Sequence, residues 1–299
     1  MTGEDFGFLL ALLLSGASIG LMYSLIALGF VLVYKATDAI NFAQGEFVMM
    51  AGLIAAAVLG MGENYLIAAI VATLAIMIAF GFGLERVVLR PLLGRPVVAV
   101  IMATIGLAAM LRGLTPIVFG SATQAVSLPI GDEPIAIGPA SLSPIQALGA
   151  TVAVVFFLAF NWFFKKSRMG VAMRAVADNQ QVAQAMGINV ERYFALAWAM
   201  AGIVSALGGI IWGSMLGVDI QLALVGLKVF PVVILGGLDS IGGALLGGLI
   251  VGIVESLAAG YLDPYVGGGT KDFAPYLLMI LVLMVRPYGI FGRRQIERV

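Results

Sequence analysis

The chain contains no cysteine and no histidine, and only 11% of its 299 residues are charged. The lack of cysteine excludes disulfides, thiolate metal sites and cysteine nucleophiles, and the lack of histidine removes the usual proton shuttle and the commonest metal ligand. A catalytic centre would have to be built from serine, aspartate, glutamate or lysine, and the sequence offers no convincing nucleophile–base pair among them. We therefore expect a protein that is not an enzyme and that carries no metal or other cofactor.

Apolar residues make up 62% of the chain. Soluble domains carry about 25% charged residues, and a helix of roughly 20 apolar residues crosses a bilayer. The alternation of a transmembrane barrel is absent, whereas the 39 glycines are typical of closely packed membrane helices. The predicted fold class is an all-α polytopic membrane protein. The first basic residue is Lys35, whereas a signal peptide begins with positive charge, so we expect the first apolar run to be a retained helix.

We interpret eight apolar segments as membrane-crossing by the criterion of about 20 residues. They fall at roughly 8–34, 39–61, 65–89, 97–119, 145–164, 193–216, 222–259 and 273–285. The 222–259 segment is too long for one crossing and contains the interruption LGGLDSIGG around Asp239. Pro231 also favours a broken helix there. We therefore predict about eight transmembrane helices plus a broken or re-entrant segment, within a single transmembrane domain spanning 1–299.

The orientation follows from the Lys/Arg bias of short loops, which favours the cytoplasmic side. Basic residues gather in three places: Arg86, Arg90 and Arg95; Lys165, Lys166, Arg168, Arg174 and Arg192; and Arg286, Arg293, Arg294 and Arg298. The loop 120–144 has Asp132 and Glu133 but no basic residue. Alternation then places the N-terminus outside and the C-terminus inside.

Residues 165–192 form a polar stretch that is long for a simple connector. A short helix is predicted over Val171–Ala177, and Asp178, three residues before Gln181, resembles a capping box that starts a second helix. Gly187 is a plausible C-cap. Small apolar residues fall near one face at helical spacing, namely Ala172, Ala175, Val176, Ala183 and Met186. The pattern indicates a docking surface for a soluble partner; the alternative is a solvated helix lying on the lipid headgroups.

Several polar residues interrupt the apolar runs, where each ionisable group costs about 2.5 to 3.5 kcal/mol at the bilayer centre. They are Asn41, Gln44 and Glu46 in the second segment, Arg112 in the fourth, and Lys228 and Glu255 in the interrupted one. One interpretation is that they line a translocation pathway. The other is structural, with Lys228 paired to Glu255 and Arg112 snorkelling to the outer interface. No P-loop motif is present, so any ATP-driven motor must be another chain.

Three collinear stretches carry a resemblance to a known family. They are GLMYSLIALGFVLVYKATDAINFAQGEFVMMAG at 20–52, GVAMRAVADNQQVAQAMGINVER at 170–192 and GLKVFPVVILGGLDSIGGALLGGLIVGIVESL at 226–257. Over nearly its whole length the chain resembles the branched-chain amino-acid permease family of ATP-binding cassette (ABC) importers, and most closely the LivH-type subunit.

The resemblance implies a type II importer-like permease fold in a bacterial inner membrane, with the N-terminus periplasmic and the C-terminus cytoplasmic. It implies four partners: a second, LivM-like permease subunit, two cytoplasmic ATPase subunits and a periplasmic substrate-binding protein. The ATPase-coupling element of the family maps onto this chain within the segment 165–192, at Gly170, Arg174, Ala175, Asp178, Asn179 and Gly187. The pathway would then carry branched-chain amino acids or related small polar substrates.

Two alternatives remain at this stage. The same family includes permeases for urea, short amides and some aromatic acids. A different class is the ion-coupled secondary transporter, in which Glu46, Lys228 and Glu255 would be the coupling groups and no ATPase would be needed.

Overall fold

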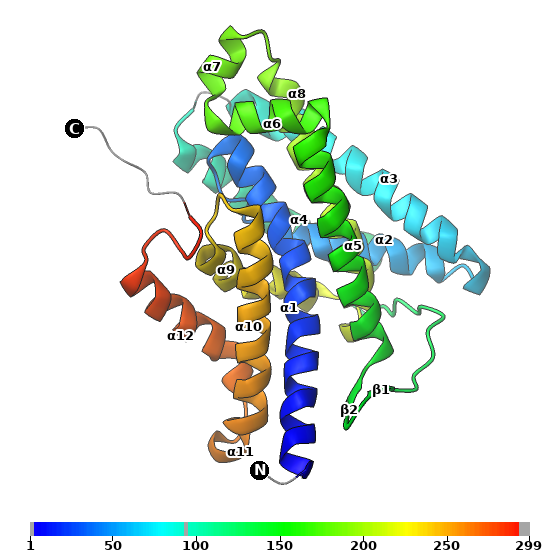
Figure 1. Ribbon diagram of the computed structural model, residues 1–299. Helices are drawn as coiled ribbons and strands as arrows, with labels where there is room; N and C mark the ends of the chain where they lie inside the picture. Colours follow the sequence, from blue (N-terminus) through cyan, green and yellow to red (C-terminus); the bar gives the residue numbers. More distant parts are fainter. Residues whose placement is uncertain (1–2, 93–94, 293–299) are drawn as a thin grey trace. The chain divides into compact units, whose positions relative to one another are not determined.

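The computed structural model describes residues 3–92 and 95–292 and is almost entirely helical (Figure 1). Its α-helices are α1 (Gly3–Thr37), α2 (Gln44–Leu59), α3 (Leu66–Leu84), α4 (Val97–Phe119), α5 (Pro144–Lys166), α6 (Arg168–Asp178), α7 (Gln180–Ala185), α8 (Val190–Leu216), α9 (Leu224–Gly236), α10 (Ile241–Tyr261), α11 (Asp263–Val266) and α12 (Thr270–Val285). Short 3₁₀ or π turns cover η1 (Glu63–Tyr65), η2 (Glu85–Leu89), η3 (Arg90–Leu92) and η4 (Ile220–Ala223). The hairpin of β1 (Ile135–Ile137) and β2 (Ala140–Leu142) is antiparallel, with Ala136 opposite Ser141.

The all-α polytopic class is confirmed, because the described residues contain six helices long and apolar enough to cross a membrane. These are α1, α4, α5, α8, α10 and the continuous helix formed by α3, η2 and η3. Two shorter apolar helices lie at Gln44–Leu59 and Ile220–Gly236. The number of full crossings stays a prediction. The tail residues Arg293, Arg294 and Arg298 lie outside the described residues.

The chain forms two compact units. Unit 1 contains residues 1–31, 130–154 and 228–299, and unit 2 contains residues 32–129 and 155–227. Three of the passages between the units occur inside the helices α1, α5 and α9. The two units are described separately below, and the expectation of one permease domain over 1–299 stays a prediction.

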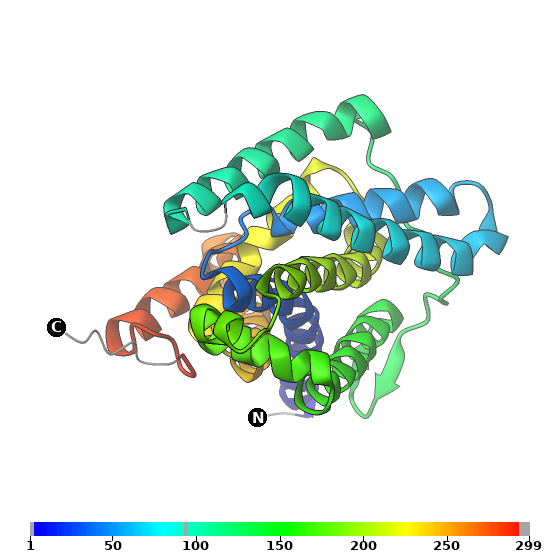
Figure 2. The same ribbon diagram turned by 90° about the horizontal axis from the view of Figure 1, so that it is seen from above.

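Unit 2 is built around α8, which packs against α2 and α3. Figure 2 shows these helices side by side, with α4 beside α2. The buried core joins Phe47 of α2, Met77 of α3 and Trp198 of α8, and the Phe47 and Trp198 rings lie 6.0 Å apart. Small residues bring the backbones together, because a side chain on Gly202 would overlap the carbonyl group of Met77.

In unit 1 the first part of α1 runs beside α10 along facing glycines (Figure 1). A side chain on Gly252 would overlap the backbone of Gly16 and Gly20, so the two helices touch through their main chains. Ser24 completes the contact by donating a hydrogen bond to the carbonyl oxygen of Leu245 at 3.1 Å. Because apolar burial gives little drive for association in lipid, this close packing is what holds the helices together.

The interrupted segment 222–259 is confirmed as two helices, α9 and α10, with Asp239 in the gap between them. Gly237 has a φ of +99°, which ends α9, and the Ser240 hydroxyl accepts a hydrogen bond from the Gly243 amide at 2.9 Å to start α10. The last carbonyl groups of α9 accept hydrogen bonds from the amides of residues 290 and 291.

Pro231, which in the sequence favours a broken helix, is not where the helix breaks. Pro231 lies inside α9, and the helix continues past it to Gly236. A proline inside a membrane helix is tolerated where neighbouring groups satisfy the freed carbonyl. The glycines and the capping serine, rather than the proline, therefore determine where the helix ends.

The α1–α10 contact predicts opposite outcomes for two glycines of one helix. Gly252→Ala places a methyl group against the α1 backbone and should lower the free energy of unfolding by about 2 kcal/mol. Gly242→Ala is the matched control, because nothing lies within 4 Å of its added methyl group, and it should change stability by less than about 0.5 kcal/mol. Thermal unfolding of the two variants in detergent measures the difference; equal stabilities would contradict the packing described.

Candidate functional site

The polar segment 165–192 contains the two predicted short helices, α6 and α7. Ser167 caps α6, its hydroxyl accepting a hydrogen bond from the Gly170 amide at 2.8 Å. The second helix is capped by Asn179, whose side-chain oxygen accepts from the Val182 amide at 2.9 Å. The predicted cap, Asp178, is wrong by one residue: it is the exposed last residue of α6, whereas Asn179 has the extended backbone that a cap requires.

Gly187 ends α7, as predicted. Its φ is +82°, its amide donates to the carbonyl of Gln184, and the Ile188 amide donates to the carbonyl of Ala183, both at 3.0 Å. This pair of hydrogen bonds is the Schellman arrangement, which a glycine permits without a steric penalty. The chain then turns directly into α8, whose first turn is capped by Asn189.

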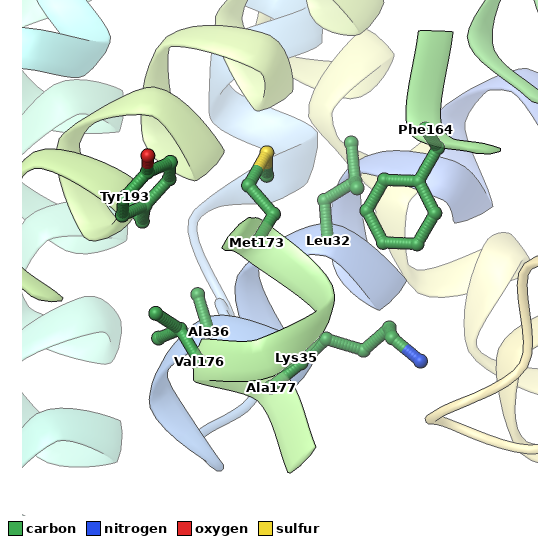
Figure 3. Close-up of a pocket in the computed structure, with 8 residues that line it drawn as sticks. All are labelled: Leu32, Lys35, Ala36, Phe164, Met173, Val176, Ala177 and Tyr193. Atoms are coloured by element: carbon green, nitrogen blue, oxygen red, sulfur yellow. The ribbon is translucent and has the colours of Figure 1, made fainter. Parts of the chain in front are cut away.

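One face of α6 anchors the segment to the rest of unit 2. Met173 and Val176 are buried and lie beside the last turns of α1 and the first turn of α8 (Figure 3). They surround a cavity of only about 10 Å³, with Leu32, Ala36 and Tyr193 among its other lining residues. Such a cavity holds about one water, so the contact is close.

Three further contacts hold α6 and α7 in place. The Arg174 guanidinium donates to the carbonyl oxygen of Phe164 and lies 5.5 Å from the centre of its ring. A side chain on Gly170 would lie 2.6 Å from the carbonyl oxygen of Phe163, so only glycine fits. Gln180 donates to the carbonyl oxygen of Ala36 at 3.1 Å. Of the six predicted coupling residues, Gly170 and Arg174 therefore hold the segment against the membrane helices.

The predicted small apolar face is divided in the structure. Val176 and Ala183 are buried within the chain, and Ala172 and Ala175 are partly buried, so these four do not form an open docking stripe. The exposed apolar surface consists instead of Met169, Val171, Val182 and Met186, whose exposed fractions are 44%, 50%, 59% and 78%. The predicted helical spacing is correct, but the small residues on that face pack against the rest of the chain instead of facing a partner.

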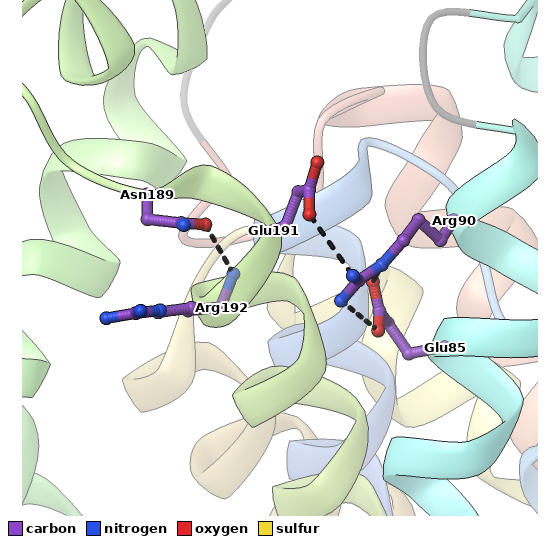
Figure 4. Close-up of polar contacts among 5 residues, drawn as sticks. All are labelled: Glu85, Arg90, Asn189, Glu191 and Arg192. Atoms are coloured by element: carbon purple, nitrogen blue, oxygen red, sulfur yellow. Dashed lines mark hydrogen bonds and ion pairs between the residues drawn. The ribbon is translucent and has the colours of Figure 1, made fainter.

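An ion-pair network joins the start of α8 to the end of the α3 helix (Figure 4). Arg90 makes two hydrogen bonds to the buried Glu85 carboxylate, at 3.2 and 3.0 Å, and pairs with Glu191 at 3.2 Å. Glu85 begins the π turn η2. From the sequence, Arg90 served only as a sign of orientation. The five-residue spacing of Glu85 and Arg90 could have indicated their ion pair. Glu191 lies too far along the chain for its pairing with Arg90 to be predicted from spacing.

A cavity of about 240 Å³ lies beside this network. Its polar lining includes Asp38, Glu85, Arg95 and Gln180, and its apolar lining includes Trp198. Charges of both signs surround it, and it is wide enough to hold several waters. Gln180 brings the segment 165–192 to the edge of this cavity.

Asn41 and Gln44 hold the non-helical turn that precedes α2. The Asn41 amide donates to Gln44 at 3.1 Å, Gln44 donates to the Ser205 hydroxyl at 2.9 Å, and the Asn41 oxygen accepts from the Ala43 amide at 3.1 Å. The Thr104 hydroxyl accepts from the Phe42 amide at 3.2 Å. Asn41 and Gln44, both predicted pathway residues, are fully buried. Their hydrogen bonds satisfy the Ala43 amide, which is not paired within a helix, and the Ser205 hydroxyl.

Glu46, in the first turn of α2, is ion-paired with Arg112 of α4. Glu46 is only 2% exposed, whereas Arg112 is 44% exposed. The Arg112 guanidinium is thus held at one end of the bundle by a buried carboxylate. The alternative that it snorkels to the outer interface stays a prediction. Neither this pairing nor that of Gln44 to Ser205 was proposed from the sequence.

In unit 1, Lys228 and Glu255 belong to a cluster with Tyr23 and Asp272, which we name the Lys228 cluster. The Lys228 ammonium lies 2.6 Å from an Asp272 oxygen but 3.8 Å from Glu255 Oε1. The Tyr23 hydroxyl donates to the same Glu255 oxygen at 3.3 Å. The Lys228–Glu255 pair expected as the structural alternative is present, yet Asp272 is the closer partner. Because Tyr23 and Asp272 lie far away in the sequence, the pattern gave no signal for them.

Comparisons with known proteins assign a family to the chain. The model of the branched-chain amino acid transport system / permease component family matches residues 12–283. The high-affinity branched-chain amino acid transport system permease protein LivH of Escherichia coli is 35% identical over 99% of both chains. The related protein BraD of Pseudomonas aeruginosa is 32% identical over 96% of this chain and 97% of its own. A probable LivH of Methanocaldococcus jannaschii is 29% identical over 90% of this chain and 88% of its own.

The Glu46–Arg112 pair predicts an asymmetric response to substitution. Arg112→Met leaves a buried carboxylate without its partner and should lower the free energy of unfolding by about 3 kcal/mol. Glu46→Gln leaves a guanidinium that already reaches the surface, so a loss of about 1 kcal/mol is expected. The double variant should be more stable than Arg112→Met alone. Chemical unfolding in detergent completes the cycle, and equal losses from the two single variants would contradict the burial difference.

Proposed function

The chain belongs to the branched-chain amino acid transport permease family, and from this we propose that it forms half of the transmembrane pathway of an ABC importer. It is a membrane-embedded transport subunit and not an enzyme. Such a permease works with separate ATPase and substrate-binding subunits. The finer proposal is that its pathway is completed by a second, LivM-like permease subunit, that two ATPases bind its cytoplasmic side and that a periplasmic protein delivers the substrate.

The proposed substrates are branched-chain amino acids or related small polar molecules. This proposal rests on the three relatives, whose names all describe branched-chain amino acid transport. Urea, short amides and aromatic acids, considered from the sequence, are not favoured by these relatives. An ion-coupled carrier is not favoured either, because the relatives are permease components of transport systems.

The observation that supports ATPase docking most directly is the segment of α6 and α7. It is held to unit 2 by Met173, Val176 and Arg174, yet presents Val182 and Met186 to the outside. Exposed apolar side chains can bind a partner. Because the segment is anchored to the membrane helices, a movement of that partner would be transmitted to them. In this mechanism, ATP-driven closure of the two ATPases moves the segment. The movement is passed to the adjoining ends of α8 and α1, and the pathway opens to one side of the membrane and then to the other.

The pathway itself is proposed to involve the polar residues of the membrane segments. The proposed residues of unit 2 are Asn41, Gln44 and Glu46, and those of unit 1 are Lys228 and Glu255. In many transporters the substrate site lies where transmembrane helices are interrupted. The side-chain amides of Asn41 and Gln44 form hydrogen bonds inside the protein. Their proposed role is therefore to hold the start of α2 in place beside the pathway.

Docking is tested by placing charge on the exposed apolar residues. The double variant Val182→Asp, Met186→Asp should abolish co-purification of the ATPase subunits, because two carboxylates would be desolvated in the interface. Membrane insertion should be unchanged, since both side chains are exposed. Ile135→Asp, an exposed apolar residue of β1, is the matched control and should retain the ATPases. Full ATPase retention by the double variant would rule out this docking surface.

The proposed orientation is tested with single cysteines, because the natural chain has none. Cysteine at Asn179 should resist a membrane-impermeant maleimide in intact cells and react after the membrane is opened, since α6–α7 is proposed to face the cytoplasm. Cysteine at Glu133 should react in intact cells. Both residues are exposed in the structure. The reverse labelling pattern would overturn the orientation, with the N-terminus then inside.

A further inference from the structure

The Lys228 cluster has an unequal number of charges. It contains two carboxylates, Glu255 and Asp272, and one ammonium group within 4 Å of both, Lys228, whereas Lys271 acts on Glu255 from farther away. The ammonium is 2.6 Å from Asp272 and too far from Glu255, at 3.8 Å, for a hydrogen bond. One oxygen of Glu255 accepts from Tyr23, whereas the other, Oε2, is buried and has no hydrogen-bond partner among the described residues. The cluster therefore lacks one cationic hydrogen-bond donor.

The other buried glutamates of the described chain show that this is unusual. Glu85 receives two hydrogen bonds from Arg90, and Glu46 is paired with Arg112. Glu255 is 9% exposed and lies in α10, a membrane-spanning helix by length and composition. A buried polar atom without a partner requires an explanation, and an intramembrane carboxylate is by default a candidate functional group.

We propose that Glu255 accepts the ammonium group of a permeating α-amino acid. A primary ammonium group carries the missing charge and supplies three hydrogen-bond donors, and one of them would satisfy Oε2. Lys228, 3.8 Å from the other oxygen, is near enough to meet the carboxylate of the same zwitterion. Tyr23 fixes the Glu255 side chain from the opposite oxygen and is a positioning residue.

This inference rests on the proposed import function and narrows its substrate class. A site with an acceptor for ammonium and a donor for carboxylate favours zwitterions over neutral amides and urea, which carry no ammonium group. Part of the choice of substrate would then lie in the permease, after release from the binding protein. Discrimination by a buried polar group that would be left unpaired is strong, because the wrong substrate does not restore its hydrogen bond.

The test uses the whole transporter in proteoliposomes, with radiolabelled L-leucine as the probe. Initial uptake and ATP hydrolysis are measured together for the natural chain and for Glu255→Gln. The substitution keeps the shape but removes the charge, so leucine uptake should fall about tenfold or more. Glu255→Asp should recover part of the uptake. Glu133→Gln, the same change on an exposed loop residue, is the matched control and should import at the natural rate.

A second variant keeps the test decisive if Glu255→Gln does not assemble. Asp272 is 58% exposed and its replacement should be tolerated. Asp272→Asn releases Lys228 to bind Glu255, so the ammonium of leucine must displace it, and the KM for leucine should rise several-fold with little change in kcat. A purely structural role for the cluster would alter stability without this division between KM and kcat.

The outcomes separate this inference from the function on which it rests. Natural leucine uptake by Glu255→Gln, or an unchanged KM for Asp272→Asn, overturns the ammonium site while ATP-dependent import by the natural chain still supports the importer. If the natural transporter imports a neutral amide in an ATP-dependent manner but no amino acid, the proposed substrate and the ammonium site both fail. If uptake is independent of ATP, the importer itself is wrong.

Discussion

Every polar backbone group that leaves a helix inside the apolar part of this chain must find a partner within the protein, because lipid offers none. Two interruptions show how this requirement is met. Before α2, Asn41 and Thr104 accept hydrogen bonds from the amides of the turn. Between α9 and α10, Ser240 caps the new helix, and amides of residues 290 and 291 cover the end of the old one. The positions of the polar side chains, and through them the proposed pathway, depend on these local solutions.

Charged side chains within the apolar helices also need partners inside the protein, and an unpaired charge there costs more free energy than an unpaired backbone group. Glu46 and Glu85 are each neutralised by an arginine that also reaches the surface, so the buried member of the pair is compensated while the exposed member retains water. Glu255 is the exception among them, with one oxygen compensated and the other not.

Much of the fold could be predicted from the sequence, because apolar length and glycine position are local properties. The bounds of α4 were correct to the residue, and the gap around Asp239 was expected. The cap of α7 was missed by one position, since Asp178 and Asn179 are both good capping residues and only the backbone conformation distinguishes them. The candidate site was less predictable. Lys228 and Glu255 were found as charges out of place, but Tyr23 and Asp272 became visible only when distant helices were brought together.

The Schellman turn at Gly187 bears on the mechanics of energy transfer. Two hydrogen bonds cross the turn, and only Met186 to Ile188 lie between the end of α7 and the cap of α8, so the connection is short and stiff. A flexible tether would absorb a displacement of a few ångströms and dissipate it as thermal motion. A stiff joint instead converts that displacement into rotation or translation of the long helix behind it. In the proposed mechanism, such a joint would keep ATP hydrolysis and substrate movement in a fixed ratio.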